Sequence, residues 1–248
     1  MEDVDEAQWT SEWLKSSNPN IETRMFKGID NCWPTDADLI RCLGVVLTGS
    51  TCTCVDDYPH TEPLFSFFKT VIRLQVPMLT ICYSAQMLVR WLGGKENVTH
   101  LSAPHVGFIR IEIPSNDAND RCFPLLSDVM NRSLISVSAQ SDAFILPDKL
   151  KQFPVQVAST IQETRFIHAA STTGWKYQAF ELHSLPVWGV QFHPNWSADN
   201  AETVFHILKS VNLDVTIKRE GTVDEDERCH MAGRFLSACH QHAMLKKD

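Results

Sequence analysis

The sequence predicts an α/β fold in which a mainly parallel central sheet carries helices on both faces. Three observations indicate this fold. Two short apolar runs, 43–48 and 77–81, have the length and composition of buried strands. A segment with helical spacing of apolar residues follows each run, and a strand-rich half then precedes another helix. Because right-handed crossovers join parallel neighbours, both apolar runs are expected in one sheet.

Strands and helices alternate in the first half of the chain. The predicted elements are a strand over 43–48, a helix over 61–75, a strand over 77–81 and a helix over 84–92. The first strand runs into Gly49 and Ser50, which are loop signals, and Gly93 and Gly94 end the second helix.

Short strands dominate the second half, where apolar runs recur near 106–113, 133–138, 155–159, 165–170, 176–181 and 186–192. A helix is predicted over about 198–211. The domain prediction is an N-terminal segment over 1–20, a main domain over 21–212 and a helical C-terminal tail over 213–248. Trp9 and Trp13 stand at helical spacing, so the N-terminal segment is expected to contain a short helix.

The composition is that of an ordinary globular domain, with 44% hydrophobic and 21% charged residues among 248. The formal net charge of -8 argues against binding to nucleic acid or to an acidic membrane surface. The acidic start does not resemble a secretory signal, and no apolar run approaches the length of a membrane span. We therefore expect a cytoplasmic protein whose eight cysteines are reduced thiols.

Cys82 stands where the second predicted strand meets the helix that follows it. This strand–nucleophile–helix order is the nucleophile elbow of hydrolases, in which a sharp turn lifts the reactive atom out of the sheet. The free N–H groups and the positive dipole end of the helix favour a thiolate and an oxyanion there. The alternative is a small buried hydrophobic residue, which is common for free cysteine.

His193 ends the strand predicted over 186–192 and is followed by Pro194. Proline stops the strand, so the imidazole is expected at the carboxyl edge of the sheet, where open α/β sheets place their sites. A thiol needs such a base to give up its proton and to protonate the leaving amine. A lone histidine at a strand end is more often structural, but the Cys82 turn favours the functional interpretation.

Together these segments resemble the class I glutamine amidotransferases, which carry Gly-x-Cys-x-Gly-x-Gln and a later Gly-x-Gln-x-His-Pro-Glu. The corresponding residues here run from Thr80 to Gln86 and from Gly189 to Asn195. The fold implied is the flavodoxin-like architecture of that family. Similarity over about 26–50 further suggests the small γ-glutamyl peptidase type.

The resemblance implies a role for each matched residue. Cys82 attacks the γ-amide carbon to form a γ-glutamyl thioester, and His193 moves the proton. Gly49 and Tyr83 supply oxyanion N–H groups, and Ser50 belongs to the same Gly-Ser loop as Gly49. Gln86 helps to line the glutamyl pocket. No cofactor is implied, and the partner is a small-molecule γ-glutamyl substrate.

The sequence departs from the family pattern at several places. Asn195 replaces the third triad glutamate; its side-chain oxygen is expected to orient the imidazole, and Asp199 or Glu202 are alternatives for that role. Thr80 and Ser84 replace the elbow glycines, and the β-branched Thr80 is expected to fit a tight turn poorly. The usual first strand is not recognisable, which leaves an open sheet edge and makes a homodimer through it one hypothesis.

Two functions from different classes remain open at this point. The first is a thiol-dependent hydrolase or transferase of γ-glutamyl amide bonds. The second is a catalytically degenerate member of the fold that binds a ligand or partner, which the departures from the pattern motivate. The sequence identifies neither the γ-glutamyl substrate nor the acceptor. Reactivity of Cys82 separates the two functions.

The tail contains residue types that bind zinc, at Cys229, His230, Cys239, His240 and His242. The ten-residue gap between the two groups does not match a usual ligand spacing. We therefore expect a helix that packs its apolar residues on the domain, and no metal site.

Overall fold

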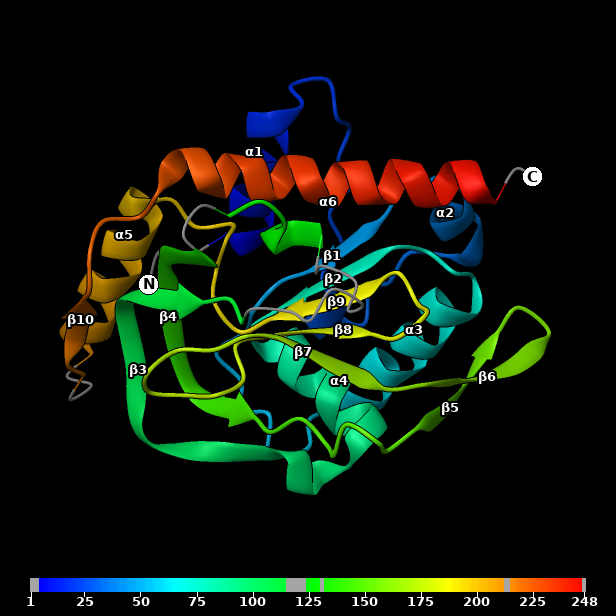
Figure 1. Ribbon diagram of the computed structural model, residues 1–248, viewed down its shortest axis with the longest axis horizontal. Coiled ribbons are helices and arrows are strands. Elements are labelled where there is room, and N and C mark those ends of the chain that lie inside the picture. Colours follow the sequence, from blue (N-terminus) through cyan, green and yellow to red (C-terminus); the bar gives the residue numbers. More distant parts are fainter. Residues whose placement is uncertain (1–4, 115–123, 130–131, 212–214, 247–248) are drawn as a thin grey trace.

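The computed structural model describes residues 5–114, 124–129, 132–211 and 215–246 (Figure 1). Its helices are α1 (Glu6–Ser17), α2 (Asp36–Arg41), α3 (Thr61–Arg73), α4 (Tyr83–Gly93), α5 (Ala198–Ser210) and α6 (Glu225–Leu245). Its strands are β1 (Val45–Leu47), β2 (Met78–Ile81), β3 (Val98–Glu112), β4 (Ser133–Phe144), β5 (Phe153–Val157), β6 (Thr160–Thr164), β7 (Phe166–Ala170), β8 (Ala179–Leu182), β9 (Val187–Val190) and β10 (Ile217–Arg219).

The central sheet has five strands in the order β1-β2-β9-β8-β7. β1, β2 and β9 are parallel neighbours, whereas β8 is antiparallel to both β9 and β7. The connections that join β7, β8 and β9 contain no helix, and short links of this kind produce antiparallel neighbours. The predicted α/β class is therefore confirmed, with one antiparallel strand in the sheet.

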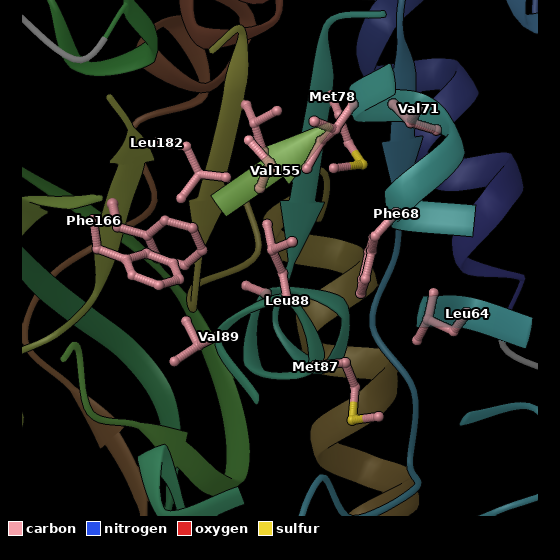
Figure 2. Close-up of a cluster of buried hydrophobic side chains, with 14 of the residues drawn as sticks. Leu64, Phe68, Val71, Met78, Met87, Leu88, Val89, Val155, Phe166 and Leu182 are labelled. Carbon is pink, nitrogen blue, oxygen red and sulfur yellow. The ribbon is translucent and has the colours of Figure 1, made fainter. Parts of the chain in front are cut away.

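Helices cover both faces of this sheet, as predicted. Successive strand residues point to opposite faces, so Met78 packs toward α3 and α4 while Leu79 packs toward α1 and α6. Figure 1 shows α6 along one face, with α3 and α4 on the other. Figure 2 shows the cluster on the α3–α4 face, with Phe68, Leu88 and Leu182 among its members. These two apolar layers hold the carboxyl ends of β2 and β9 in place.

A second sheet, in the order β10-β3-β4, lies beside the central one. Its strands β3 and β4 form a long antiparallel ladder, and α5 packs on it through an apolar cluster that includes Phe108 and Phe205. Val137 of β4 forms a backbone bridge with His193, so the second sheet reaches the end of β9. The β5–β6 hairpin packs against α3.

The predicted N-terminal segment and C-terminal tail are both helical and pack together on the central sheet. Trp13 of α1 is 1% exposed and its indole N–H donates to the carbonyl of Arg228 in α6 at 2.7 Å. Both helices therefore pack against the main domain. The predicted boundary at 212 and 213 lies outside the described residues.

Within the described residues no strand precedes β1, which pairs with β2 alone and forms an edge of the central sheet. The segment before β1 instead contains α1, which packs against α6. Asp5 begins this helix by accepting a hydrogen bond from the N–H of Gln8. A homodimer through the β1 edge stays a prediction. None of the helices in the described ranges combines the length and apolar character needed to cross a bilayer.

Candidate functional site

Cys82 forms a sharp turn between β2 and α4. Its φ of 54° and ψ of -112° lie where L-residues are rarely found, a strain typical of functional positions and worth roughly 1–3 kcal/mol. Two backbone hydrogen bonds hold the turn: the N–H of Cys82 donates to Val190 of β9 at 2.8 Å, and its carbonyl accepts from Gln86 at 3.0 Å. The predicted strand–cysteine–helix turn is thus present, with elbow geometry.

The two residues that replace the elbow glycines fit the turn because their hydroxyls bond to backbone. Thr80 is fully buried and donates to the carbonyl of Trp188 in β9 at 3.1 Å. The Ser84 hydroxyl donates to the carbonyl of Leu47 in β1 at 2.7 Å and accepts from the N–H of Ile81 at 2.8 Å. The expectation that Thr80 fits poorly is therefore wrong. Both hydroxyls tie the elbow to its neighbouring strands.

The Cys82 thiol is enclosed by polar groups and is 5% exposed. The side-chain amide of Gln191 donates to Sγ at 3.5 Å, and the carbonyl of Ala139 in β4 lies 3.9 Å from Sγ. Burial raises the pKa of the thiol strongly, and the charge of Glu6 raises it further. The Tyr83 N–H and the Gln191 amide act in the opposite direction. Both donors face the sulfur, so they stabilise negative charge on it.

His193 follows β9, and its backbone N–H donates to the carbonyl of Val137 at 2.8 Å. The ring stacks on Trp196 with 3.9 Å between centroids and is 2% exposed. Among the described residues neither ring nitrogen has a hydrogen-bond partner of ordinary geometry. Burial lowers the pKa of His193 to about 3, so the ring is neutral and can accept a proton. The same burial makes it a weak base.

Asn195 does not make the contact expected of a third triad member. Its amide nitrogen donates to the hydroxyl of Thr10 in α1 at 3.0 Å, and its side-chain oxygen has no partner among the described residues. Of the two alternatives, Asp199 lies in the first turn of α5, and Glu202 pairs with Arg219 at 2.6 Å. Asn195 therefore connects the His193 loop to α1.

The carboxyl group nearest the imidazole comes from Glu6 in the first turn of α1. Its Oε1 lies 3.6 Å from Nδ1 of His193. The Gly49 N–H, the Trp196 side chain and the Thr48 hydroxyl act to lower the pKa of Glu6, but burial outweighs them and raises it to about 7. The site thus contains a carboxyl group whose protonation changes near neutral pH.

Glu6 was not among the residues expected at the site. One signal in the sequence points to it: Glu6, Trp9 and Trp13 share a helical face, since they are three and seven residues apart. A carboxylate on the face that carries two tryptophans is expected to point toward the protein and not toward solvent. The sequence does not show that His193 is the partner of Glu6, because α1 and β9 are far apart in the chain.

Gly49 lies in the loop after β1 and touches both Glu6 and His193. A Cβ at this position would lie 3.1 Å from Glu6 Oε2 and 3.1 Å from His193 Cε1, so the close approach favours glycine. Ser50 is exposed, and its hydroxyl accepts from the N–H of Cys52 at 3.1 Å within the loop. The structure therefore brings Gly49 to the site and leaves Ser50 in the loop beside it.

Gln86 lies behind the thiol rather than in an open pocket. It is 3% exposed, and its amide donates to the carbonyl of Asp142 at 2.8 Å and to Oε1 of Gln191 at 3.2 Å. Gln191 in turn donates to Cys82 Sγ. The glutamine of each sequence motif thus helps to orient the amide that faces the sulfur. Gln191 was part of the quoted motif, but its role was not expected.

The tail residues with zinc-binding side chains do not come together at one point. Cys239 packs in the core, and Nε2 of His242 lies 2.8 Å from the carbonyl of Gln75. Within the described ranges no group of three or more His, Cys, Asp and Glu side chains is arranged to hold a metal ion. The helix α6 packs Met231, Phe235 and Cys239 in the core.

Comparison with known proteins identifies the family. Residues 29–211 match the model of the glutamine amidotransferase class-I family. A glutamine-hydrolyzing GMP synthase of Wigglesworthia glossinidia brevipalpis is 30% identical over 154 residues, which cover 61% of this chain and 25% of that protein. A glutamine-hydrolyzing GMP synthase of Phocaeicola vulgatus is 28% identical over 173 residues, 70% of this chain and 28% of that protein.

Two solved structures share the fold. A glutamine amido transferase from Methylobacillus flagellatus superimposes with a TM-score of 0.66 at 15% identity, covering 92% of this chain and 88% of that one. A glutamine amidotransferase from Thermotoga maritima gives 0.59 at 15% identity, covering 90% and 87%. The chain belongs to the class I glutamine amidotransferase family, and its match spans about a quarter of the length of these GMP synthases.

Proposed function

Because the chain belongs to the class I glutamine amidotransferase family, we propose that it is a thiol-dependent hydrolase or transferase of γ-glutamyl amide bonds. One observation carries the proposal. Cys82 occupies a strained elbow, where the Tyr83 N–H and the Gln191 amide face its sulfur. A buried hydrophobic cysteine needs neither the strain nor the two donors.

In the proposed reaction these groups transfer one proton and form one covalent intermediate. His193 takes the thiol proton of Cys82, and the sulfur attacks the γ-carbonyl carbon. The carbonyl oxygen becomes negative and is stabilised by the N–H of Tyr83. The Gly49 N–H, the other expected donor, faces the carboxyl group of Glu6. As the C–N bond breaks, the leaving amine takes the proton from His193, which leaves a γ-glutamyl thioester. Water then attacks the thioester; His193 accepts its proton, and the restored thiol departs as glutamate is released.

The experiment compares glutamine with glutathione as substrates and follows free glutamate and ammonia. Cys82→Ala is expected to abolish turnover. Cys32→Ala is the matched control, because Cys32 is exposed and lies outside the site, and it is expected to behave like the wild type. Release of glutamate from glutathione in excess of that from glutamine supports the γ-glutamyl peptidase type. Turnover that survives in Cys82→Ala contradicts the thiol mechanism.

A catalytically degenerate binding protein is the second candidate, and one feature favours it. Cys82 and His193 are both nearly inaccessible, and the carboxyl group of Glu6 lies against the N–H of Gly49, where an oxyanion is expected. A glutamine analogue with an electrophile at its γ-carbon separates the two functions. An enzyme is labelled stoichiometrically at Cys82 and protected by glutamine, whereas a binding protein is not labelled.

A further inference from the structure

We propose that Glu6 in α1 supplies the positioning carboxylate for His193 that position 195 lacks. The inference rests on the proposed function, since it assigns the third member of the same catalytic group. It places an essential side chain in a helix that precedes the region matched by the family model, residues 29–211. Glu6 and His193 are far apart in the chain, and the fold alone brings them together.

The geometry places a carboxyl group within ion-pair distance of the imidazole. Oε1 of Glu6 lies 3.6 Å from Nδ1 of His193, and a Cβ on Gly49 would touch both side chains. A carboxylate on this side favours the tautomer that carries hydrogen on Nδ1. Nε2 is then the acceptor for the thiol proton, and the carboxylate stabilises the imidazolium that forms.

The environment of His193 explains why a carboxylate is needed there. Burial leaves the ring neutral and weakly basic, and burial also disfavours the thiolate of Cys82. A negative charge beside Nδ1 raises the basicity of the ring at the moment when it takes the proton. The titratable groups around the Glu6 carboxyl are His193 and Cys82, with Asp142 of β4 acting on Cys82.

The helix that carries Glu6 is held at the site by specific side-chain contacts. Trp9 packs edge-on against Trp196, which itself stacks on the imidazole, with 5.7 Å between the tryptophan centroids. Thr10 accepts a hydrogen bond from Asn195. The asparagine that replaces the family glutamate thus holds the helix that brings a different glutamate.

The same contacts permit one competing interpretation, which predicts the opposite effect. If α1 were an inhibitory plug, the Glu6 carboxyl would occupy the position of the γ-carboxyl of product beside Gly49. Removal of its charge would then increase turnover. The burial of Trp13 and the hydrogen bond between Asn195 and Thr10 fix α1 in place under both interpretations, so the direction of the change in turnover separates them.

The test compares Glu6→Gln and Glu6→Asp with the wild type on the better γ-glutamyl substrate. Glu6→Gln keeps the shape and removes the charge, so kcat is expected to fall at least roughly 100-fold while KM changes little. Glu6→Asp is expected to recover part of the loss. Glu12→Gln, on the exposed face of the same helix, is the matched control and keeps full turnover. Unchanged or increased turnover in Glu6→Gln overturns the proposal.

A second measurement does not depend on activity. Nitrogen NMR of the His193 ring, assigned with His193→Gln, is expected to show hydrogen on Nδ1 in the wild type. A ring resonance that shifts near pH 7 in the wild type and not in Glu6→Gln supports the pairing, whereas hydrogen on Nε2 overturns it. A wild type that shows this pairing but hydrolyses no γ-glutamyl amide refutes the proposed function and leaves the pairing in place.

Discussion

Replacement of Glu6 by glutamine is expected to change how the stability of the fold depends on pH. Burial raises the pKa of this carboxyl from 4.5 to about 7, so the folded protein holds the group protonated in a range where the unfolded chain does not. Stability from this group is complete below pH 4.5 and is lost as the pH rises through about 7. Glutamine cannot ionise, so the variant does not lose this stability.

The size of the effect follows from the two pKa values. Each factor of ten in proton affinity is worth about 1.4 kcal/mol, which gives about 3 kcal/mol for the full range. The side chain is 16% exposed, so we expect about 2–3 kcal/mol to be measured between pH 5 and pH 8. His193 acts in the opposite direction, since its pKa of about 3 makes its contribution complete above pH 6.5 and lost on acidification.

The assay is urea unfolding of wild type and Glu6→Gln at pH 5 and pH 8. The difference between the two proteins, taken at each pH, removes the contributions of titratable groups that both share. The variant is expected to gain about 2–3 kcal/mol relative to the wild type between pH 5 and pH 8. Glu12→Gln makes the same chemical change on the exposed face of α1. Parallel curves for wild type and Glu6→Gln would refute the assignment of a buried, protonated carboxyl.

Three further variants test the packing around the site. Ser84→Ala leaves the Ile81 N–H and a β1 carbonyl without their partner, so the free energy of unfolding is expected to fall by about 1–3 kcal/mol in urea titrations. Gly189→Ala places a methyl group 2.2 Å from the ring of Phe180, and a cost of about 1–3 kcal/mol is expected as a lower melting temperature; an unchanged value contradicts the close approach. Asn195→Glu removes the donor to α1 and buries a charge, so circular dichroism melts are expected to show a less stable protein with no gain in turnover.

The sequence was sufficient to predict the elements around the nucleophile. Apolar runs and helical spacing predicted β1, α3, β2 and α4 within a few residues, because these patterns depend on neighbours close in the chain. The second sheet was less predictable. The run near 106–113 belongs to β3, which extends from Val98 to Glu112, and β10 was missed because three residues carry little periodicity.

The turn at Cys82 shows which features a sequence motif predicts and which it does not. The order of residues around Cys82 and His193 indicated the turn, the strand end and the family. It did not indicate that Thr80 and Ser84 bond to neighbouring strands, because the carbonyls that accept from them lie on β9 and β1. Replacing a motif glycine destabilises the turn only when the new side chain finds no hydrogen-bond partner.

The sequence by itself determined the α/β class through the order of apolar runs and helical spacings along the chain. It also determined the position of the nucleophile turn and of the histidine after β9, because each depends on a few adjacent residues. Only the tertiary structure decided which carboxyl group faces that histidine. Asn195 is two residues from His193 in the chain but bonds to α1, whereas Glu6 is distant in the chain and lies 3.6 Å from the ring. Contacts between distant segments depend on how helices pack on the sheet. α1 reaches the site because Trp13 is buried against the central core and Trp9 packs edge-on against Trp196.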